Sequence, residues 1–182
     1  MLQAETMRVP IKRQYLGEGD NAIYKTLDLM KDISLESMKN PNIRYFVASM
    51  LSRNPVNKLE ELNSIFNFIK RRTRFLRDPI NYELLQTPDF VIMLINSGEM
   101  PTLDCDDMAM LAATMLGVVG YDTAFKAVST NHDNEFNHVY CLVKLSNLSG
   151  GWMGFDPSNP IASIGTEPPI ITRAYIKEVW DD

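Results

Sequence analysis

Three residues of this sequence could together perform nucleophilic chemistry: Cys105, His138 and Asp156. A thiol nucleophile needs a base that can hold its proton and a third group that orients the base. Cys105 lies within "TLDCDDMAMLAA", where acidic residues precede an apolar run that is typical of a buried helix. The free N–H groups and the dipole at a helix N-terminus stabilise an anion and lower a thiol pKa. Cys105 is therefore a candidate nucleophile.

Carboxylates next to the cysteine oppose this chemistry. Asp106 and Asp107 follow Cys105 directly, and negative charges disfavour a thiolate. We expect both carboxylates to accept hydrogen bonds from free N–H groups of the first helical turn, and so to fix the helix start. An imidazolium at His138 within a few ångströms would have to outweigh them, since an opposite charge can shift a pKa by about one to three units. The hypothesis therefore depends on His138.

Strand alternation predicts which side chains can meet. In "HVYCLVKL" His138 and Cys141 fall on opposite faces, because successive side chains of a strand alternate. In "WMGFD" the face of Gly154 also carries Asp156, so antiparallel pairing of the two strands would place Asp156 beside His138. Cys141 has apolar neighbours of its own parity and is expected to be a small buried hydrophobe.

The elements that must position these residues follow from periodicity. Apolar spacing predicts helices over residues 21–40, 41–54 and 56–76, and a short helix or buried apolar segment over 89–98. The cysteine helix should run from Asp104 to Gly117 or Gly120. Turn residues dominate 77–90, whereas alternation predicts strands over 123–129, 137–145 and 151–157, followed by a last strand or short terminal helix within 168–180.

The order of helices first and strands afterwards favours an α+β domain, with an antiparallel sheet packed against the cysteine helix. The 182 residues suffice for a single domain, with a helical N-terminal part at 1–78 and a catalytic core at 79–182.

Composition excludes several classes of protein. The formal charge of −5 argues against a domain that binds nucleic acid through phosphate contacts. The apolar run "MAMLAATMLGVVG" is shorter than the roughly 20 residues that span a bilayer. Two cysteines and an N-terminus without a secretory apolar core predict synthesis in a reducing, intracellular setting. We expect the basic cluster (Lys70, Arg71, Arg72, Arg74 and Arg77) to be a solvated helix end.

The motifs resemble those of a known family. "DCDDMAMLAATMLGVVGYDTAFKAV", then "HVYCLV" and "GWMGFDPSN", are similar to the transglutaminase-like superfamily. Upstream, "FNFIKRRTRFLRDPINYELLQTPDF" resembles versions encoded by tailed phages and prophages. The resemblance implies a papain-like fold with Cys105 as nucleophile, His138 as base and Asp156 as the orienting carboxylate. Leu103 departs from the family, which usually has Gly there.

The resemblance also implies the reaction. A thiol acyl-transfer enzyme of this kind would attack an amide carbonyl of a protein or peptide, without a cofactor. Water as acceptor gives a peptidase or amidase that cleaves a peptide or isopeptide bond, and an amine gives a cross-linking transglutaminase. We expect hydrolysis, because water is the default acceptor. The Cys105 N–H would hold the oxyanion with a second donor, for which Asn137, Gln86 and Tyr82 are candidates.

Two alternatives remain open. A non-enzymatic phage assembly or virion protein could keep the fold, with phage structural proteins as partners and a location in the host cytoplasm or the virion. A metal site is the other, since "NHDNEFNH" offers His132, Asp133, Glu135 and His138. Their spacing matches no strong zinc pattern, so we expect no metal.

Overall fold

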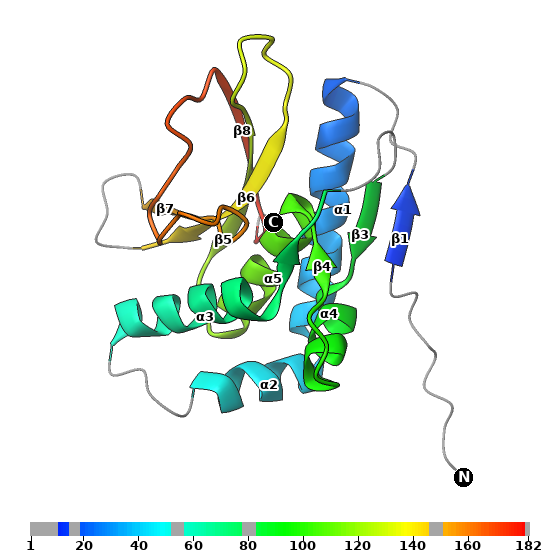
Figure 1. Ribbon diagram of the computed structural model, residues 1–182, viewed down its shortest axis with the longest axis vertical. Coiled ribbons are helices and arrows are strands. Elements are labelled where there is room, and N and C mark those ends of the chain that lie inside the picture. Colours follow the sequence, from blue (N-terminus) through cyan, green and yellow to red (C-terminus); the bar gives the residue numbers. More distant parts are fainter. Residues whose placement is uncertain (1–10, 15–18, 52–56, 78–82, 146–150, 181–182) are drawn as a thin grey trace.

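The computed structural model describes residues 11–14, 19–51, 57–77, 83–145 and 151–180. The helices are α1 (Asp20–Met38), α2 (Pro41–Leu51), α3 (Lys58–Arg72), α4 (Pro88–Asn96) and α5 (Cys105–Val118). The strands are β1 (Ile11–Gln14), β2 (Arg74–Phe75), β3 (Glu83–Gln86), β4 (Thr102–Leu103), β5 (Thr123–Ser129), β6 (His138–Lys144), β7 (Trp152–Phe155) and β8 (Arg173–Glu178). Figure 1 shows the helices gathered beside and below one sheet.

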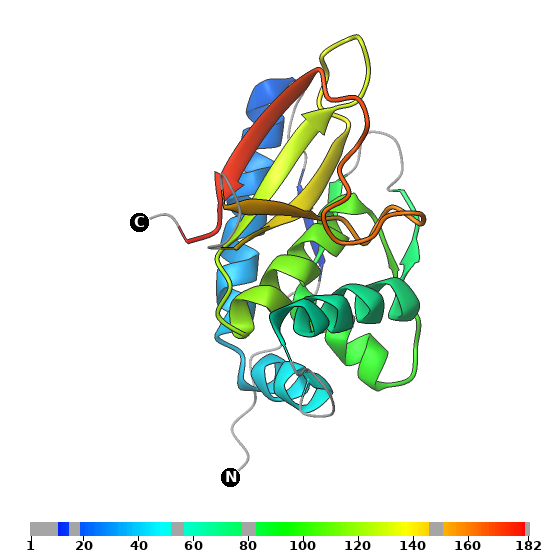
Figure 2. The same ribbon diagram turned by 90° about the vertical axis from the view of Figure 1, so that its left-hand side faces the viewer.

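The main sheet has four antiparallel strands in the order β7-β6-β5-β8. Its register pairs Cys141 with Phe155 and Val128 with His138. Two smaller pairings lie outside it, antiparallel between β1 and β3 and parallel between β2 and β4. Figure 2 shows the sheet above α5, with α1 (blue) running alongside the sheet. The predicted α+β architecture, with the cysteine helix packed on an antiparallel sheet, is confirmed.

Helix α5 lies at the centre of the molecule. Its residues from Asp107 to Leu116 are all buried, which explains why the helix has no polar face. One side packs on the sheet face that carries Val139, Cys141 and Val143. Helices α1 and α3 contribute to the same hydrophobic core as the sheet, so both parts of the chain share one core.

The opposite face of the sheet carries a smaller cluster that contains Tyr140 and Leu142. The alternation predicted for "HVYCLVKL" is therefore confirmed, and Cys141 is fully buried on the α5 side. Alternation along β6 puts His138 in phase with Tyr140, while its place as the first residue of the strand leaves it at the end of the sheet.

The predicted helix over 56–76 is wrong at its C-terminal end. Thr73 is extended and ends α3, and Arg74 and Leu76 then donate backbone hydrogen bonds to Pro101 and Leu103. The turn-rich segment at 77–90 contains β3, and the tail forms β8 and not a helix. These strands depend on pairing with distant segments, which local periodicity does not report.

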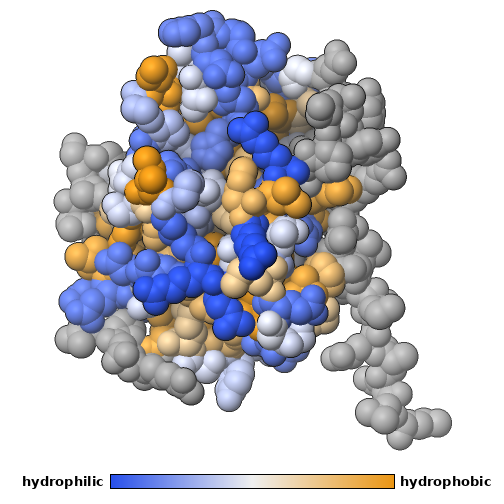
Figure 3. All heavy atoms as spheres, viewed as in Figure 1, coloured by the Kyte–Doolittle hydropathy of each residue, from blue (hydrophilic) through white to orange (hydrophobic). Residues whose placement is uncertain are grey.

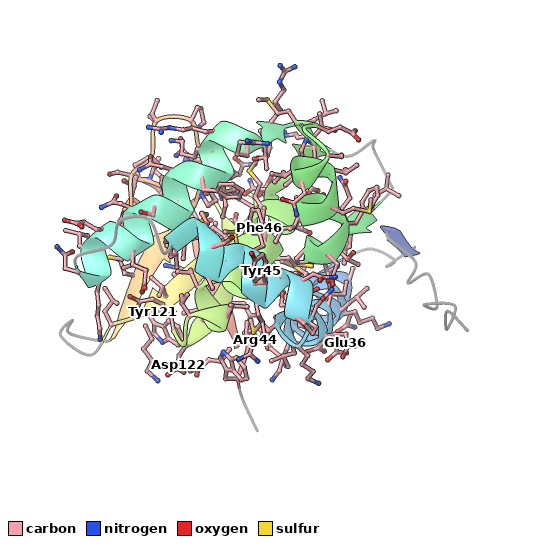
Figure 4. The ribbon with its side chains drawn as sticks, turned by 90° about the horizontal axis from the view of Figure 1, so that it is seen from below. Glu36, Arg44, Tyr45, Phe46, Tyr121 and Asp122 are labelled. Carbon is pink, nitrogen blue, oxygen red and sulfur yellow. The ribbon has the colours of Figure 1, made fainter. Side chains whose placement is uncertain are left out.

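Helix α2 covers the underside of the molecule. It buries Ile43, Val47 and Leu51 and presents Tyr45, 78% exposed, to solvent (Figure 4). No helix in the described part of the chain combines the length and apolarity that a bilayer crossing requires.

Candidate active site

The start of α5 positions Cys105, and Asp104 caps it. The Asp104 carboxylate accepts a hydrogen bond of 3.1 Å from the backbone N–H of Asp107, as an N-cap residue does. Asp106 and Asp107 lie in the first turn as expected, and the side chain that caps the helix is that of Asp104, the residue before the cysteine. This matters because the cap sets the direction in which the first helical residue, Cys105, presents its sulfur.

Asp107 connects α5 to β3. Its carboxylate is buried and accepts two hydrogen bonds from Gln86 of β3, one from the backbone N–H (2.7 Å) and one from side-chain Nε2 (3.0 Å). Gln86 Nε2 also donates to the Thr102 carbonyl at 2.8 Å, so both of its N–H groups are engaged. The side chain of Gln86 therefore secures β3 to α5 and β4, and as an oxyanion donor it would have to break these bonds.

The thiol of Cys105 is partly exposed and donates a hydrogen bond to Asp106 Oδ1 at 3.3 Å. Burial raises the pKa of Cys105 well above its ordinary value, and the charges of Asp106 and Asp104 raise it further. A hydrogen bond from the Val139 backbone acts in the opposite direction without compensating. Burial and the neighbouring carboxylates thus favour the thiol over the thiolate, against the effect of the helix N-terminus.

His138 and Asp156 form a hydrogen-bonded pair, with 2.9 Å between Nε2 and Oδ2. The antiparallel pairing of β6 with β7 brings them together, which confirms their predicted juxtaposition. Asp156 Oδ1 accepts from both the N–H (3.1 Å) and the hydroxyl (2.6 Å) of Ser158. Burial opposes ionisation of Asp156, yet these hydrogen bonds from His138 and Ser158 hold its pKa below the ordinary value.

The pairing also determines which atom of His138 can act on a substrate. Nε2 faces Asp156, so Nδ1 is the ring nitrogen left to exchange a proton with a thiol. The ring stacks on Tyr140 with centroids 5.6 Å apart, which fixes its plane.

Cys105 and His138 line one cavity of about 190 Å³ at the end of the sheet. Asp104, Asp106 and Asn137 contribute its polar wall, and residues of α1 and the β5–β6 connection its apolar wall. His138, as the first residue of β6, and Cys105, as the first residue of α5, thus both contribute to the wall of this cavity.

The oxyanion candidates differ in placement. Asn137 lines the cavity, and its Oδ1 accepts hydrogen bonds from Thr130, which turns the amide nitrogen away from that residue. The N–H of Cys105 lies in the first turn of α5, where backbone donors have no helical partner. Tyr82 lies outside the described residues.

Ser158 was missed in the sequence, although its position signals its role. A serine two residues after an aspartate is the arrangement in which the carboxylate accepts hydrogen bonds from the following turn, and "DPS" has this spacing.

No cluster of three or more His, Cys, Asp or Glu side chains within the described ranges could hold a metal ion. His132, Asp133 and Glu135 lie exposed in the β5–β6 connection, where Asp133 accepts from the Glu135 N–H.

The similarity of this chain to known proteins is low. No family model matches the sequence, and no curated protein does. Among solved structures, a candidate cysteine protease from Cytophaga hutchinsonii aligns with a TM-score of 0.47 and 12% identity, covering 83% of this chain. A candidate protease from Parabacteroides distasonis aligns over 85% of this chain with a TM-score of 0.48 and 16% identity.

LapG from Legionella pneumophila aligns over 84% of this chain and 81% of its own length, with a TM-score of 0.45 and 14% identity. The chain spans 57% of the Cytophaga protein and 35% of the Parabacteroides protein.

Proposed function

We propose that this protein is a thiol acyl-transfer enzyme that hydrolyses amide bonds in proteins or peptides, as a member of the transglutaminase-like superfamily. The supporting observation is that His138, which is hydrogen-bonded to Asp156, lines the same cavity as Cys105 at the start of α5. A cysteine that served only as packing would need neither a base nor a buried carboxylate to orient that base.

The proposed mechanism starts from the protonated thiol. His138 Nδ1 takes the Cys105 proton as the sulfur attacks the substrate carbonyl, and Asp156 stabilises the imidazolium through Nε2. The Cys105 N–H, with Asn137 as the second candidate donor, holds the oxyanion. His138 then protonates the leaving amine, and water, activated by the same nitrogen, hydrolyses the thioester.

Direct transfer of the proton from Cys105 to His138 would compensate for the neighbouring carboxylates, which disfavour a free thiolate. The thiol does not need to ionise in the resting enzyme, because the base can remove the proton during attack. Encoding by a phage or prophage, with phage structural proteins as partners and a location in the host cytoplasm or the virion, remains a proposal that rests on the sequence resemblance alone.

Thiol reactivity tests this proposal. The background is Cys141→Ser, which leaves Cys105 as the one cysteine of the chain. We expect His138→Ala to reduce the rate at which iodoacetamide modifies Cys105 near pH 7 by at least tenfold. Asp156→Asn should reduce the rate less than His138→Ala, because it removes the orienting charge but keeps the base.

A rate that stays unchanged in His138→Ala would contradict the catalytic assignment. Incubating the enzyme with a peptide mixture and an excess of an alkylamine then separates the two acyl acceptors. Hydrolysed products support a peptidase, whereas products carrying the amine indicate a transglutaminase.

A further inference from the structure

A second, larger cavity of about 700 Å³ opens on the other side of His138. His138 and Asn137 line both this cavity and the one that holds Cys105, so a chain bound in the second cavity would run past the base. Its walls come from three regions: the segment after α3, the β5–β6 connection and the segment after β7. Apolar side chains stand exposed in it, among them Phe75 (45%) and Ile170 (54%).

The charge of this cavity is unbalanced. Among the residues that the structure describes, its charged lining residues besides His138 are Arg77 and Asp156. Asp156 is buried and directs Oδ2 to His138 and Oδ1 to Ser158, so both of its oxygens are engaged inside the site. Within the described part of the chain, the exposed Arg77 thus lines a cavity in which the one carboxylate, that of Asp156, is already hydrogen-bonded.

Arg77 also differs from the rest of the basic cluster. Lys70 donates to the carbonyls of Pro160 and Ala162, and Arg72 to the carbonyl of Ile95, so these two side chains hold neighbouring segments in place. Arg71 lies on the exposed side of α3, outside the second cavity. Figure 3 shows a band of hydrophilic side chains across this face, over α3.

The cavity that Cys105 lines carries negative charge, opposite to the charge of Arg77. Asp104 and Asp106 line the smaller cavity, and their charges already raise the pKa of the thiol. An anionic group of a substrate would be repelled there and attracted on the Arg77 side. The two cavities thus form a polarised cleft with the base between them.

We propose that the substrate is a peptide segment with an acidic residue, whose carboxylate pairs with Arg77 while neighbouring apolar side chains lie against Phe75 and Ile170. This inference rests on the proposed peptidase function and adds the substrate class. A guanidinium binds a carboxylate through two parallel hydrogen bonds, which fixes the register of the peptide relative to the scissile bond. The acidic residue should therefore occupy one constant position in all substrates.

Digestion of a proteome-derived peptide library, with cleavage sites identified by mass spectrometry, tests the inference. In wild type we expect Asp and Glu to be enriched at one fixed distance from the cleaved bond. Arg77→Gln should lower kcat/KM for an acidic peptide about two- to fivefold, the effect of one exposed ion pair, and leave the matched Asn or Gln peptide unchanged. Arg77→Glu should invert the preference toward Lys and Arg.

Arg71→Glu is the matched control, because it changes the net charge equally but lies outside the second cavity. Arg71→Glu should retain both the acidic preference and the wild-type rate of Cys105 alkylation. Cleavage without acidic enrichment, or equal enrichment in Arg77→Glu, would overturn the inference and leave the peptidase intact. Absence of any cleavage by wild type would overturn the peptidase, and the inference with it.

Discussion

The Cys105 thiol contacts a carboxylate that works against its ionisation. The Asp106 carboxylate accepts a hydrogen bond from the thiol at 3.3 Å. After burial, the charge of Asp106 is the largest contribution that raises the pKa of Cys105. A residue that restrains the thiol in this way leaves its activation to the base. The resting protein should consequently react slowly with general electrophiles unless His138 assists.

Asp106→Asn tests this restraint. The amide keeps the size of the side chain but removes the charge, so the pKa of Cys105 should fall. Each pKa unit raises the thiolate fraction about tenfold below the pKa, and we expect roughly that gain in the alkylation rate at pH 7. The rate is measured against pH in the Cys141→Ser background, with the exposed Asp133→Asn as control. A rate that stays the same or falls would show that Asp106 does not restrain the thiol.

Asp156 predicts a pH dependence of stability. Its folded-state pKa lies below the unfolded value of about 3.9. A depressed carboxyl pKa stabilises the folded state fully above the unfolded pKa, and this contribution is lost as the pH falls through the folded pKa. Asp156→Asn should therefore lose less stability than wild type between pH 6 and pH 3.

Urea unfolding across this range measures the effect, with Asp122→Asn as a surface control that should follow the wild-type curve. Parallel curves for Asp156→Asn and wild type would contradict the assignment of a depressed pKa.

At the scale of elements, two hydrogen bonds from Gln86 to Asp107 hold β3 on α5. Asp107→Ala would leave two donors of Gln86 without their acceptor at a buried position. Leaving a buried donor unsatisfied costs about 1–3 kcal/mol, so we expect a loss of that size in the free energy of unfolding. Asp106→Ala, one residue earlier and less buried, should cost less. Equal losses in urea unfolding would show that the Gln86 contacts add no stability.

Strand β7 depends on a glycine. A Cβ at Gly154 would lie 3.0 Å from Glu167 Cγ and 3.1 Å from the Thr166 carbonyl, and the Gly154 carbonyl itself accepts from the Gly165 N–H. Gly154→Ala should push the 163–167 segment away and cost about 1–3 kcal/mol.

Gly154 precedes Asp156 by two residues, so the alanine variant should also lower the alkylation rate of Cys105 if the strand shifts. An unchanged free energy of unfolding in urea would mean that the 163–167 segment can move away from the alanine without loss of stability.

Elements with strong local patterns were predictable from the sequence, and those made by distant pairing were not. The β5 segment was predicted with its observed bounds, and α5 was predicted from its acidic start and apolar run. In contrast β2 and β4 are two residues each and exist because distant backbones meet. In the site, alternation sufficed to predict that Asp156 would meet His138. The role of Gln86 could not be predicted, because it depends on how β3 docks on α5.

At the scale of the whole molecule, one core encloses residues from both halves of the chain. Cys141 lies inside it, fully buried, and burial raises its pKa far above the ordinary value. Native protein should therefore take up one equivalent of iodoacetamide and urea-unfolded protein two, as measured by intact mass. The rate of the second addition reports opening of the shared core. Addition of two equivalents to the native protein would contradict the burial of Cys141. The urea-unfolded Cys141→Ser variant should take up one equivalent, and a second addition there would mean that the second site is not Cys141.

The pairing of β6 with β7 has a consequence for the life of the protein before it is folded. His138 and Asp156 are 18 positions apart in the chain and meet through the register of two strands. A nascent chain on the ribosome therefore carries Cys105 before His138 has its carboxylate partner. For the proposed peptidase, this means that reactivity toward cellular proteins would arise only once the sheet is complete.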